Sequence, residues 1–452
     1  MKKILFIIIF IINTKSFSQD KLAPEKLIKD IDFLIDKYEE IHPNLYAYSS
    51  KVYFKNEIYT LKKGITDSLT SIDFWMRLAP MINELKDGHT SINPNDKDLG
   101  VYLEKFNSSE MRFLPLSVFI LDSTIYVREI YGNDSVSIQA SLKVKSINGH
   151  SDIEILQKLI GYKNGERADY RMHCVQQTFL WDYSLFFPSI DYEIEYYENG
   201  LQKRKKLKGI TDKQTEKYNE IIFPRLPDYR YKLIDKNIGL IEYNSCTDID
   251  KFKLFLDSTF TKIIDQKIGN LIIDIRRNSG GNSDLNNLLL TYLYGKQFYS
   301  YSTIKVKVTE DIRNLNEMYA QFKNDTIITI DTYQANKPTN KLLFKGNVYL
   351  LTSVQTFSSG THCAMLFKDY DIGIIVGQAT GGIPTGYGDK YSFKLPFSGL
   401  KANVSYKYFI RPSGEDDRKG VLPDILIKPS IDDFFNNKDL EIDHVLKLIR
   451  NE

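Results

Sequence analysis

A serine at a predicted turn is the residue of this sequence best placed to act as a nucleophile. The segment Val348–Phe367 starts with an apolar run short enough for a buried strand, continues with the hydroxyl-rich turn Thr356–Gly360, and ends in apolar residues at helical spacing. This order predicts a strand, a tight turn and a helix, with the Ser358 hydroxyl lifted out of the core. The free backbone N–H groups of the first helical turn can bind an anion beside it. An acyl-transfer nucleophile needs such surroundings, although the pattern alone favours an ordinary helix N-cap.

A glycine pair and a histidine lie in two other predicted turns. The buried strand Asn270–Ile275 ends before Gly280 and Gly281, which precede the helix Leu285–Leu293. Two glycines at such a turn either bring backbone N–H groups close to a ligand or simply allow a tight connection with positive φ. The glycines alone do not separate these interpretations. His89 lies in a polar turn that ends a helical region, and a single loop histidine without a partner carries no catalytic weight.

The composition excludes several classes of function. The chain has 452 residues, which predicts two or three domains. Its 60 Lys and Arg residues against 58 Asp and Glu leave a net charge of +2, so there is no electrostatic reason to expect nucleic acid or an anionic membrane as partner. The three cysteines are widely spaced and form no CxxC pair, so a zinc site is not expected.

The first 18 residues have the pattern of a secretory signal peptide. Two lysines precede an apolar block from Ile4 to Ile12, and small residues follow at Ser16 and Ser18. The block is too short to span a bilayer, and no later apolar run is long enough for a membrane helix. We therefore expect a secreted or periplasmic protein that starts near Gln19.

Three regions follow the predicted signal peptide. Residues 19–98 show apolar residues at helical spacing and form a helical N-terminal region. Residues 99–210 read mainly as short alternating strands, and residues 225–452 alternate buried strands with amphipathic helices. The fold class is therefore α/β, or α+β across several domains.

The middle region resembles a PDZ domain. The strand and Asn-Gly turn of Leu142–His150 precede the helix Ile153–Leu159, which is the order found in that family. The carboxylate-binding loop of the family would fall at Phe113–Leu116, where Pro115 replaces glycine and offers no N–H. Whether this region binds peptide C-termini is therefore open.

The third region resembles the tail-specific and tricorn-core serine peptidases, whose catalytic domain has the ClpP/crotonase-like fold of ββα units. Four segments carry the resemblance, in the family's order: a strand and glycine turn, a nucleophile turn with serine third, the segment after the nucleophile helix, and a C-terminal signature. They are Ile273–Gly281, Thr356–Gly360, Val376–Gly382 and Gly420–Asp424.

The resemblance implies a Ser-His branch for this chain. Members with a Ser-Lys dyad carry a lysine in the glycine turn where this chain has Gly382, and the nearest lysine is Lys390. The tricorn-like branch instead takes a histidine from the N-terminal region, in a short turn that Asp87–Thr90 matches. His89 thereby gains Ser358 as a partner. The acid of that branch would fall at Asp417 or Glu415, and the choice between them stays open.

The resemblance also implies an oxyanion hole formed by the backbone N–H of Ser359 with that of Gly281 or Gly280. It predicts an exported serine endopeptidase that cleaves unfolded or short peptides and needs no metal or cofactor. One alternative is a non-catalytic protein that binds a peptide or hydrophobic ligand, since Thr361 stands where many relatives have glutamate. Another is a hydrolase of non-peptidic acyl compounds. The sequence does not indicate the oligomeric state.

Overall fold

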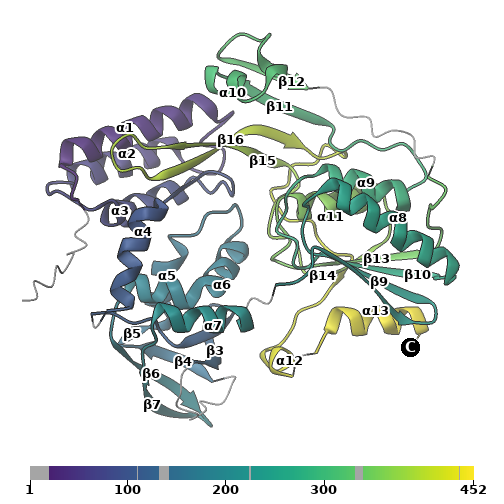
Figure 1. The fold of residues 1–452 in the computed structure, drawn as a ribbon, viewed down its shortest axis with the longest axis horizontal. Coiled ribbons are helices and arrows are strands. Elements are labelled where there is room, and N and C mark those ends of the chain that lie inside the picture. The colour runs from purple at the N-terminus through teal and green to yellow at the C-terminus, as the bar shows by residue number, and fades with distance from the viewer. Residues whose placement is uncertain are drawn as a thin grey trace, which may run out of the picture.

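The computed structural model describes residues 20–108, 110–131, 142–222, 225–330, 340–436 and 438–451. The predicted signal peptide at residues 1–18 lies outside this part of the chain. The described residues form a mixed α/β structure with several sheets and packed helices, so the predicted fold class is confirmed (Figure 1). Among them, none of the helices combines the length and the hydropathy needed to cross a bilayer.

Three N-terminal helices pack on strands that come from the other end of the chain (Figure 1). The helices are α1 (Pro24–Ile41), α2 (Lys51–Lys63) and α3 (Ser71–Asn83), and Ser50 and Thr70 cap the last two. Their buried faces contact a sheet in the order β1-β16-β11-β12, with β15 paired to β16. The strands are β1 (Ser91–Asn93), β11 (Thr303–Val308), β12 (Thr326–Ile330), β15 (Gly386–Lys394) and β16 (Lys401–Ile410). The helical region and the C-terminal half therefore share one hydrophobic core.

The middle region is an antiparallel sheet with two helices on it. The strand order is β2-β3-β4-β6-β7, with the short β5 paired to β4. The strands are β2 (Leu116–Leu121), β3 (Thr124–Ile130), β4 (Lys143–Ile147), β5 (His150–Ser151), β6 (Asp191–Glu198) and β7 (Leu201–Lys208). The covering helices are α5 (Asp152–Ile160) and α6 (Ala168–Phe186), and α7 (Asp212–Ile222) follows. Region 99–210 thus contains a long helix, α6, that the sequence analysis did not predict.

The segment where the carboxylate-binding loop of the PDZ family would fall already has an internal partner. The backbone N–H of Leu114 donates to Ser184 Oγ of α6 at 2.7 Å. On edge strand β2, the N–H of Ile120 donates to Gln176 Oε1 of the same helix at 2.8 Å. Helix α6 therefore occupies donors that an added peptide would otherwise use. The resemblance of residues 99–210 to a PDZ domain and peptide binding by them both stay predictions.

The third region is a sheet in the order β17-β14-β13-β10-β9-β8, parallel except for the antiparallel edge strand β8. The strands are β8 (Tyr229–Asp235), β9 (Ile238–Tyr243), β10 (Asn270–Asp274), β13 (Asn347–Thr352), β14 (Ile374–Gly377) and β17 (Ile425–Leu426). Helices α8 (Ile249–Asp265), α9 (Asp284–Leu293) and α11 (Ser359–Asp369) cover one face, and α13 (Leu440–Arg450) covers the other (Figure 1). Shorter helices are α4 (Asp96–Leu103), α10 (Glu310–Leu315) and α12 (Ile431–Phe435).

Two pairings bring the predicted turns to one place. Strands β10 and β13 are parallel neighbours, so the turns that follow them leave from the same edge of the sheet. Strand β1 pairs antiparallel with β16, with Ser91 opposite Asn403. Ser91 is only two residues after His89. The β1–β16 pairing therefore brings the His89 turn of the N-terminal region to the C-terminal half of the chain.

Candidate active site

Ser358 lies in a strained turn at the start of α11. Its backbone has φ 50° and ψ −120°, a conformation that a residue with a side chain seldom adopts. Main-chain hydrogen bonds hold the turn on both sides: Phe357 N–H donates to Asn278 O at 3.0 Å, and Gly381 N–H donates to Thr356 O at 2.8 Å. The serine side chain stays half-buried. The strain thus presents the hydroxyl beside the helix N-terminus instead of burying it.

His89 faces Ser358 across 269 residues of sequence. Its Nε2 lies 3.1 Å from Ser358 Oγ, and its ring stacks on Phe357 at 5.3 Å between centroids. Burial lowers the pKa of His89 below its ordinary value of 6.5, and the nearby Asp87 charge only partly opposes this. The imidazole is therefore neutral at neutral pH, as a general base must be.

Asp87 fixes the turn that carries His89. Its Oδ1 accepts the His89 backbone N–H at 2.9 Å, and its Oδ2 accepts the Thr90 hydroxyl at 2.7 Å. The same Oδ2 lies 2.9 Å from His42 Nε2, which carries the proton because His42 Nδ1 accepts the N–H of Asn44 at 3.0 Å. Burial opposes ionisation of Asp87, but the hydrogen bonds that it accepts from His42 and Thr90 outweigh this and hold the pKa of Asp87 well below its usual range. A buried carboxylate thus organises the histidine turn.

The two acids predicted for the triad lie on an exposed turn and bond to other groups. Glu415 contacts Arg411 Nη1 at 3.2 Å, and Asp417 accepts the backbone N–H of Lys419 at 3.0 Å. Among the hydrogen bonds of these described residues, none joins either carboxylate to His89. Their role stays a prediction.

The glycine turn packs directly against Ser358. A Cβ on Gly280 would lie 2.8 Å from the Ser358 Cβ and 3.0 Å from the Ser359 nitrogen. The N–H of Gly280 already donates to Asn278 Oδ1 at 2.9 Å. The N–H groups of Gly281 and Ser359 have no hydrogen-bond acceptor within the described part of the chain. The arrangement therefore favours Gly281 over Gly280 as the second oxyanion donor beside Ser359.

A second histidine, His362, lies on α11 but has a structural role. Its Nδ1 is 3.0 Å from Asn286 Nδ2, and its Nε2 is 2.9 Å from Ser300 Oγ. Asn286 also donates to the Ser359 carbonyl at 2.7 Å. These buried contacts pin the first turns of α11 to α9, and both nitrogens of His362 are engaged.

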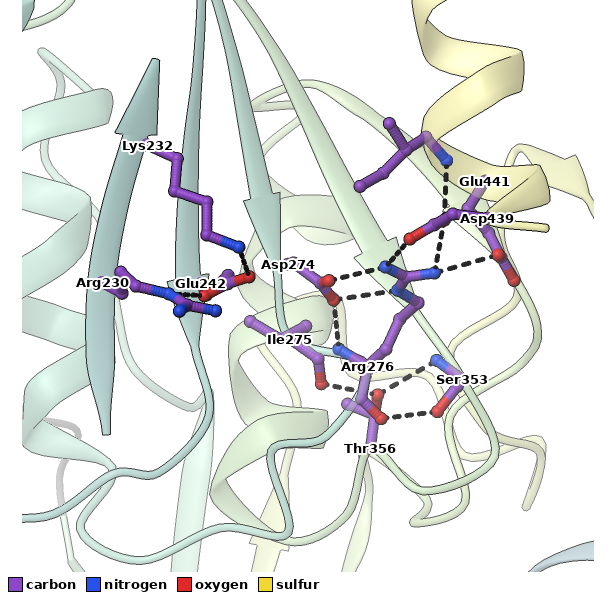
Figure 2. A network of polar contacts seen from close by, with 11 residues as sticks. Arg230, Lys232, Glu242, Asp274, Ile275, Arg276, Ser353, Thr356, Asp439 and Glu441 are labelled. Carbon is purple, nitrogen blue, oxygen red and sulfur yellow. Dashed lines mark hydrogen bonds and ion pairs between the residues drawn. The ribbon is translucent and has the colours of Figure 1, made fainter. Parts of the chain in front are cut away.

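An ion-pair network connects the end of β10 with the segment after β13 and with α13 (Figure 2). The guanidinium of Arg276, just after β10, contacts Asp274 at 2.7 and 3.0 Å, Asp439 at 2.8 and 2.9 Å, and Glu441 at 3.0 Å. Its backbone carbonyl accepts the hydroxyl of Ser353, which follows β13. One residue thus links β10, the approach to the nucleophile turn and the start of α13.

Replacing Arg276 with alanine is expected to destabilise the fold. The Arg276 side chain is 19% exposed, and its removal leaves three carboxylates without their cation. Breaking a fully buried pair costs about 3–5 kcal/mol, and partial solvent access reduces this to about 2–3 kcal/mol here. Urea unfolding measures the difference. Arg276→Lys is the matched control, which keeps the charge but loses the bidentate contacts, and an alanine variant as stable as the parent would contradict the bracing role.

Sequence reasoning missed several groups of the site. His42 and Asp87 pair across 45 residues, and Glu166 and Asn164 come from the connection between α5 and α6. The only sequence signal for these last two is a polar stretch next to Gly165, which is typical of any surface loop. Tyr170 also reaches the site, where its ring stacks on Phe357 at 4.4 Å and 6°.

Comparison with known proteins identifies the class of the C-terminal region. Residues 237–427 match peptidase family S41. Mature CPAF has a similar structure, with a TM-score of 0.67 and 14% identity over 95% of this chain and 99% of that chain in its complex with lactacystin. Another structure of mature CPAF gives 0.66 and 14% over 95% and 98%. The photosystem II D1 C-terminal processing protease gives 0.44 and 13% over 90% and 93%. No curated protein matches the sequence significantly.

Proposed function

From the peptidase family S41 domain at residues 237–427, which makes this chain a serine peptidase, we infer that Ser358 is the nucleophile and His89 its general base. The observation that carries this inference is the 3.1 Å contact between Ser358 Oγ and His89 Nε2. The two residues come from separate regions of the chain, and two main-chain supports converge to bring them together. One is the β1–β16 pairing, and the other is the hydrogen bonding of the nucleophile turn to the glycine turn.

The proposed reaction is acyl transfer in two steps. His89 Nε2 takes the proton of Ser358 Oγ as the oxygen attacks the substrate carbonyl, and it then returns the proton to the leaving amine. Water repeats the sequence to release the acyl group. The N–H groups of Ser359 and Gly281 donate to the oxyanion of each tetrahedral intermediate. These steps need no group from outside the chain other than substrate and water.

We propose that the substrates are unfolded or short peptides. Ser358 and His89 are both only partly exposed, and they lie where the N-terminal, middle and C-terminal regions meet. Such a site admits an extended chain more readily than a folded domain. Export to the periplasm or the medium is part of the proposal, and it rests on the sequence pattern of residues 1–18 alone.

Reaction with a fluorophosphonate probe tests the proposal against a binding protein on the same fold. An activated serine forms a covalent adduct, whereas an ordinary helix-cap serine does not. We expect one adduct, located on Ser358 by mass spectrometry and absent from Ser358→Ala. Ser359→Ala is the matched control, because it removes a neighbouring hydroxyl and keeps the backbone N–H. An intact protein without an adduct would refute the catalytic role of Ser358.

A further inference from the structure

The middle region reaches into the site through the connection between α5 and α6. Glu166 Oε1 accepts the backbone N–H of Gly88 at 3.0 Å, and Asn164 Nδ2 donates to the Gly88 carbonyl at 2.7 Å. A Cβ on Gly88 would lie 3.2 Å from Glu166 Oε2 and 2.6 Å from the Phe357 ring. Both main-chain polar groups of Gly88 are therefore hydrogen-bonded to the connection between α5 and α6. Because Gly88 has no side chain, Glu166 can approach this closely.

Two buried polar atoms in this cluster lack partners. His89 Nδ1 and Glu166 Oε2 are both inaccessible to solvent and make no hydrogen bond. A ring nitrogen of His89 and carboxylate oxygens of Asp87 and Glu166 all lie within 4.8 Å of one another. When Nε2 accepts the serine proton, Nδ1 must carry a hydrogen that needs an acceptor, and Glu166 Oε2 is an acceptor that needs a donor.

We propose that Glu166 is the positioning carboxylate of this active site: it accepts the Nδ1 proton of His89 in a hydrogen bond and balances the charge that His89 gains during the reaction. A rotation of the Glu166 side chain or one bridging water closes the remaining gap. The inference rests on the proposed function, and it makes the middle region a part of the catalytic centre.

Other acceptors near His89 are less suited to this task. The oxygens of Asp87 are already bonded to the His89 backbone, Thr90 and His42. The Tyr387 carbonyl faces the ring and raises the pKa of His89, but it makes no well-aligned hydrogen bond with Nδ1. A neutral carbonyl also stabilises an imidazolium less than a carboxylate does.

The protonation of Glu166 predicts where activity falls with pH. The titratable groups that face it are Asp87 and His89 from the turn after α3, Tyr48 from the loop after α1, and Tyr170 from α6. Burial, and then the Asp87 charge, raise the pKa of Glu166 to about 7. Because the carboxylate form is the active one, activity is full above this value and declines as the pH falls through it. His89 alone gives a decline only below 6.5.

The pH profile of kcat/KM on an unfolded peptide tests the proposal, with EDTA present because the same donor cluster could hold a divalent cation. For the wild type we expect an inflection near 7. Glu166→Gln is expected to lose about 10²- to 10⁴-fold at about pH 8, because its amide offers a donor to Nδ1 and favours the wrong tautomer. Its remaining activity should lack the upper inflection. Glu166→Asp keeps the charge and should keep the inflection.

Asp416→Asn, in the exposed acidic turn, is the matched control and should retain the inflection and most of the rate. If kcat/KM of the wild type declines only below pH 6.5, the proposal is overturned, whatever the stability of the variants. So would a folded Glu166→Gln enzyme with wild-type rate and profile, or a loss confined to Asp417→Asn or Glu415→Gln. A wild type that neither cleaves peptide nor reacts with fluorophosphonate would instead refute the proposed function itself.

Discussion

Replacing Ser358 with alanine is expected to lower kcat for cleavage of a denatured protein by about 10⁶-fold. In the proposed mechanism this hydroxyl forms the covalent bond to the substrate. The neighbouring Ser359 hydroxyl cannot replace it, because it bonds to Gly281 O at 2.6 Å and to Ser283 Oγ at 2.9 Å. The residual rate would come from the oxyanion hole and substrate binding. Steady-state proteolysis of a reduced, denatured protein measures the loss.

The same variant should bind substrate and remain folded. Alanine relieves no part of the backbone conformation at φ 50°, so the turn keeps its strain and its main-chain hydrogen bonds. If Ser358→Ala unfolds at the same denaturant concentration as the wild type but no longer cleaves substrate, the substitution affects the chemical step and not the fold. Cleavage that persists unchanged would show that the nucleophile lies elsewhere.

Replacing His89 with alanine is expected to lower kcat by a similar factor, about 10⁵- to 10⁶-fold. Without the imidazole, no described side chain next to Ser358 Oγ can take its proton at neutral pH. The other nearby histidine, His42, is bonded through both ring nitrogens to Asp87 and Asn44. Fluorophosphonate reaction should also slow strongly, because attack requires the base.

His362→Gln serves as the control for this variant. His362 lies on α11, but Asn286 and Ser300 hold it away from the reaction, so its replacement should cost stability and leave the proton transfer in place. A loss of kcat from His362→Gln as large as that from His89→Ala would contradict the assignment of the base.

The elements that position the nucleophile could be predicted because each has a local pattern. The buried strand predicted at the start of Val348–Phe367 is β13, and the predicted helix at Leu285–Leu293 is α9 with one more residue. Helix α6 was missed because its own apolar and aromatic residues are distributed around the helix axis. Its sequence therefore shows no single apolar stripe. Helix α7 was missed because its residues are mainly polar, as those of a connecting segment are.

The site itself depends on contacts between distant segments that no local pattern encodes. Only the family resemblance paired His89 with Ser358, since nothing in the sequence signals that two residues at a separation of 269 lie close together. The pairing of Asp87 with His42 and the approach of Glu166 arise from packing of separate regions. Family resemblance indicated Asp417 and Glu415 as the acid, whereas packing places a carboxylate oxygen of Glu166 within 4.8 Å of a ring nitrogen of His89.

A double-mutant cycle on Ser358 and His89 tests the central claim most directly, namely that these two residues act as one catalytic unit. Both single alanine variants and the double variant are assayed for kcat on the same denatured substrate. If the serine attacks only when the histidine takes its proton, the second substitution adds almost nothing, and all three variants show the same residual rate. Losses that add, with the double variant slower than either single variant by the product of their factors, would contradict the Ser358–His89 mechanism.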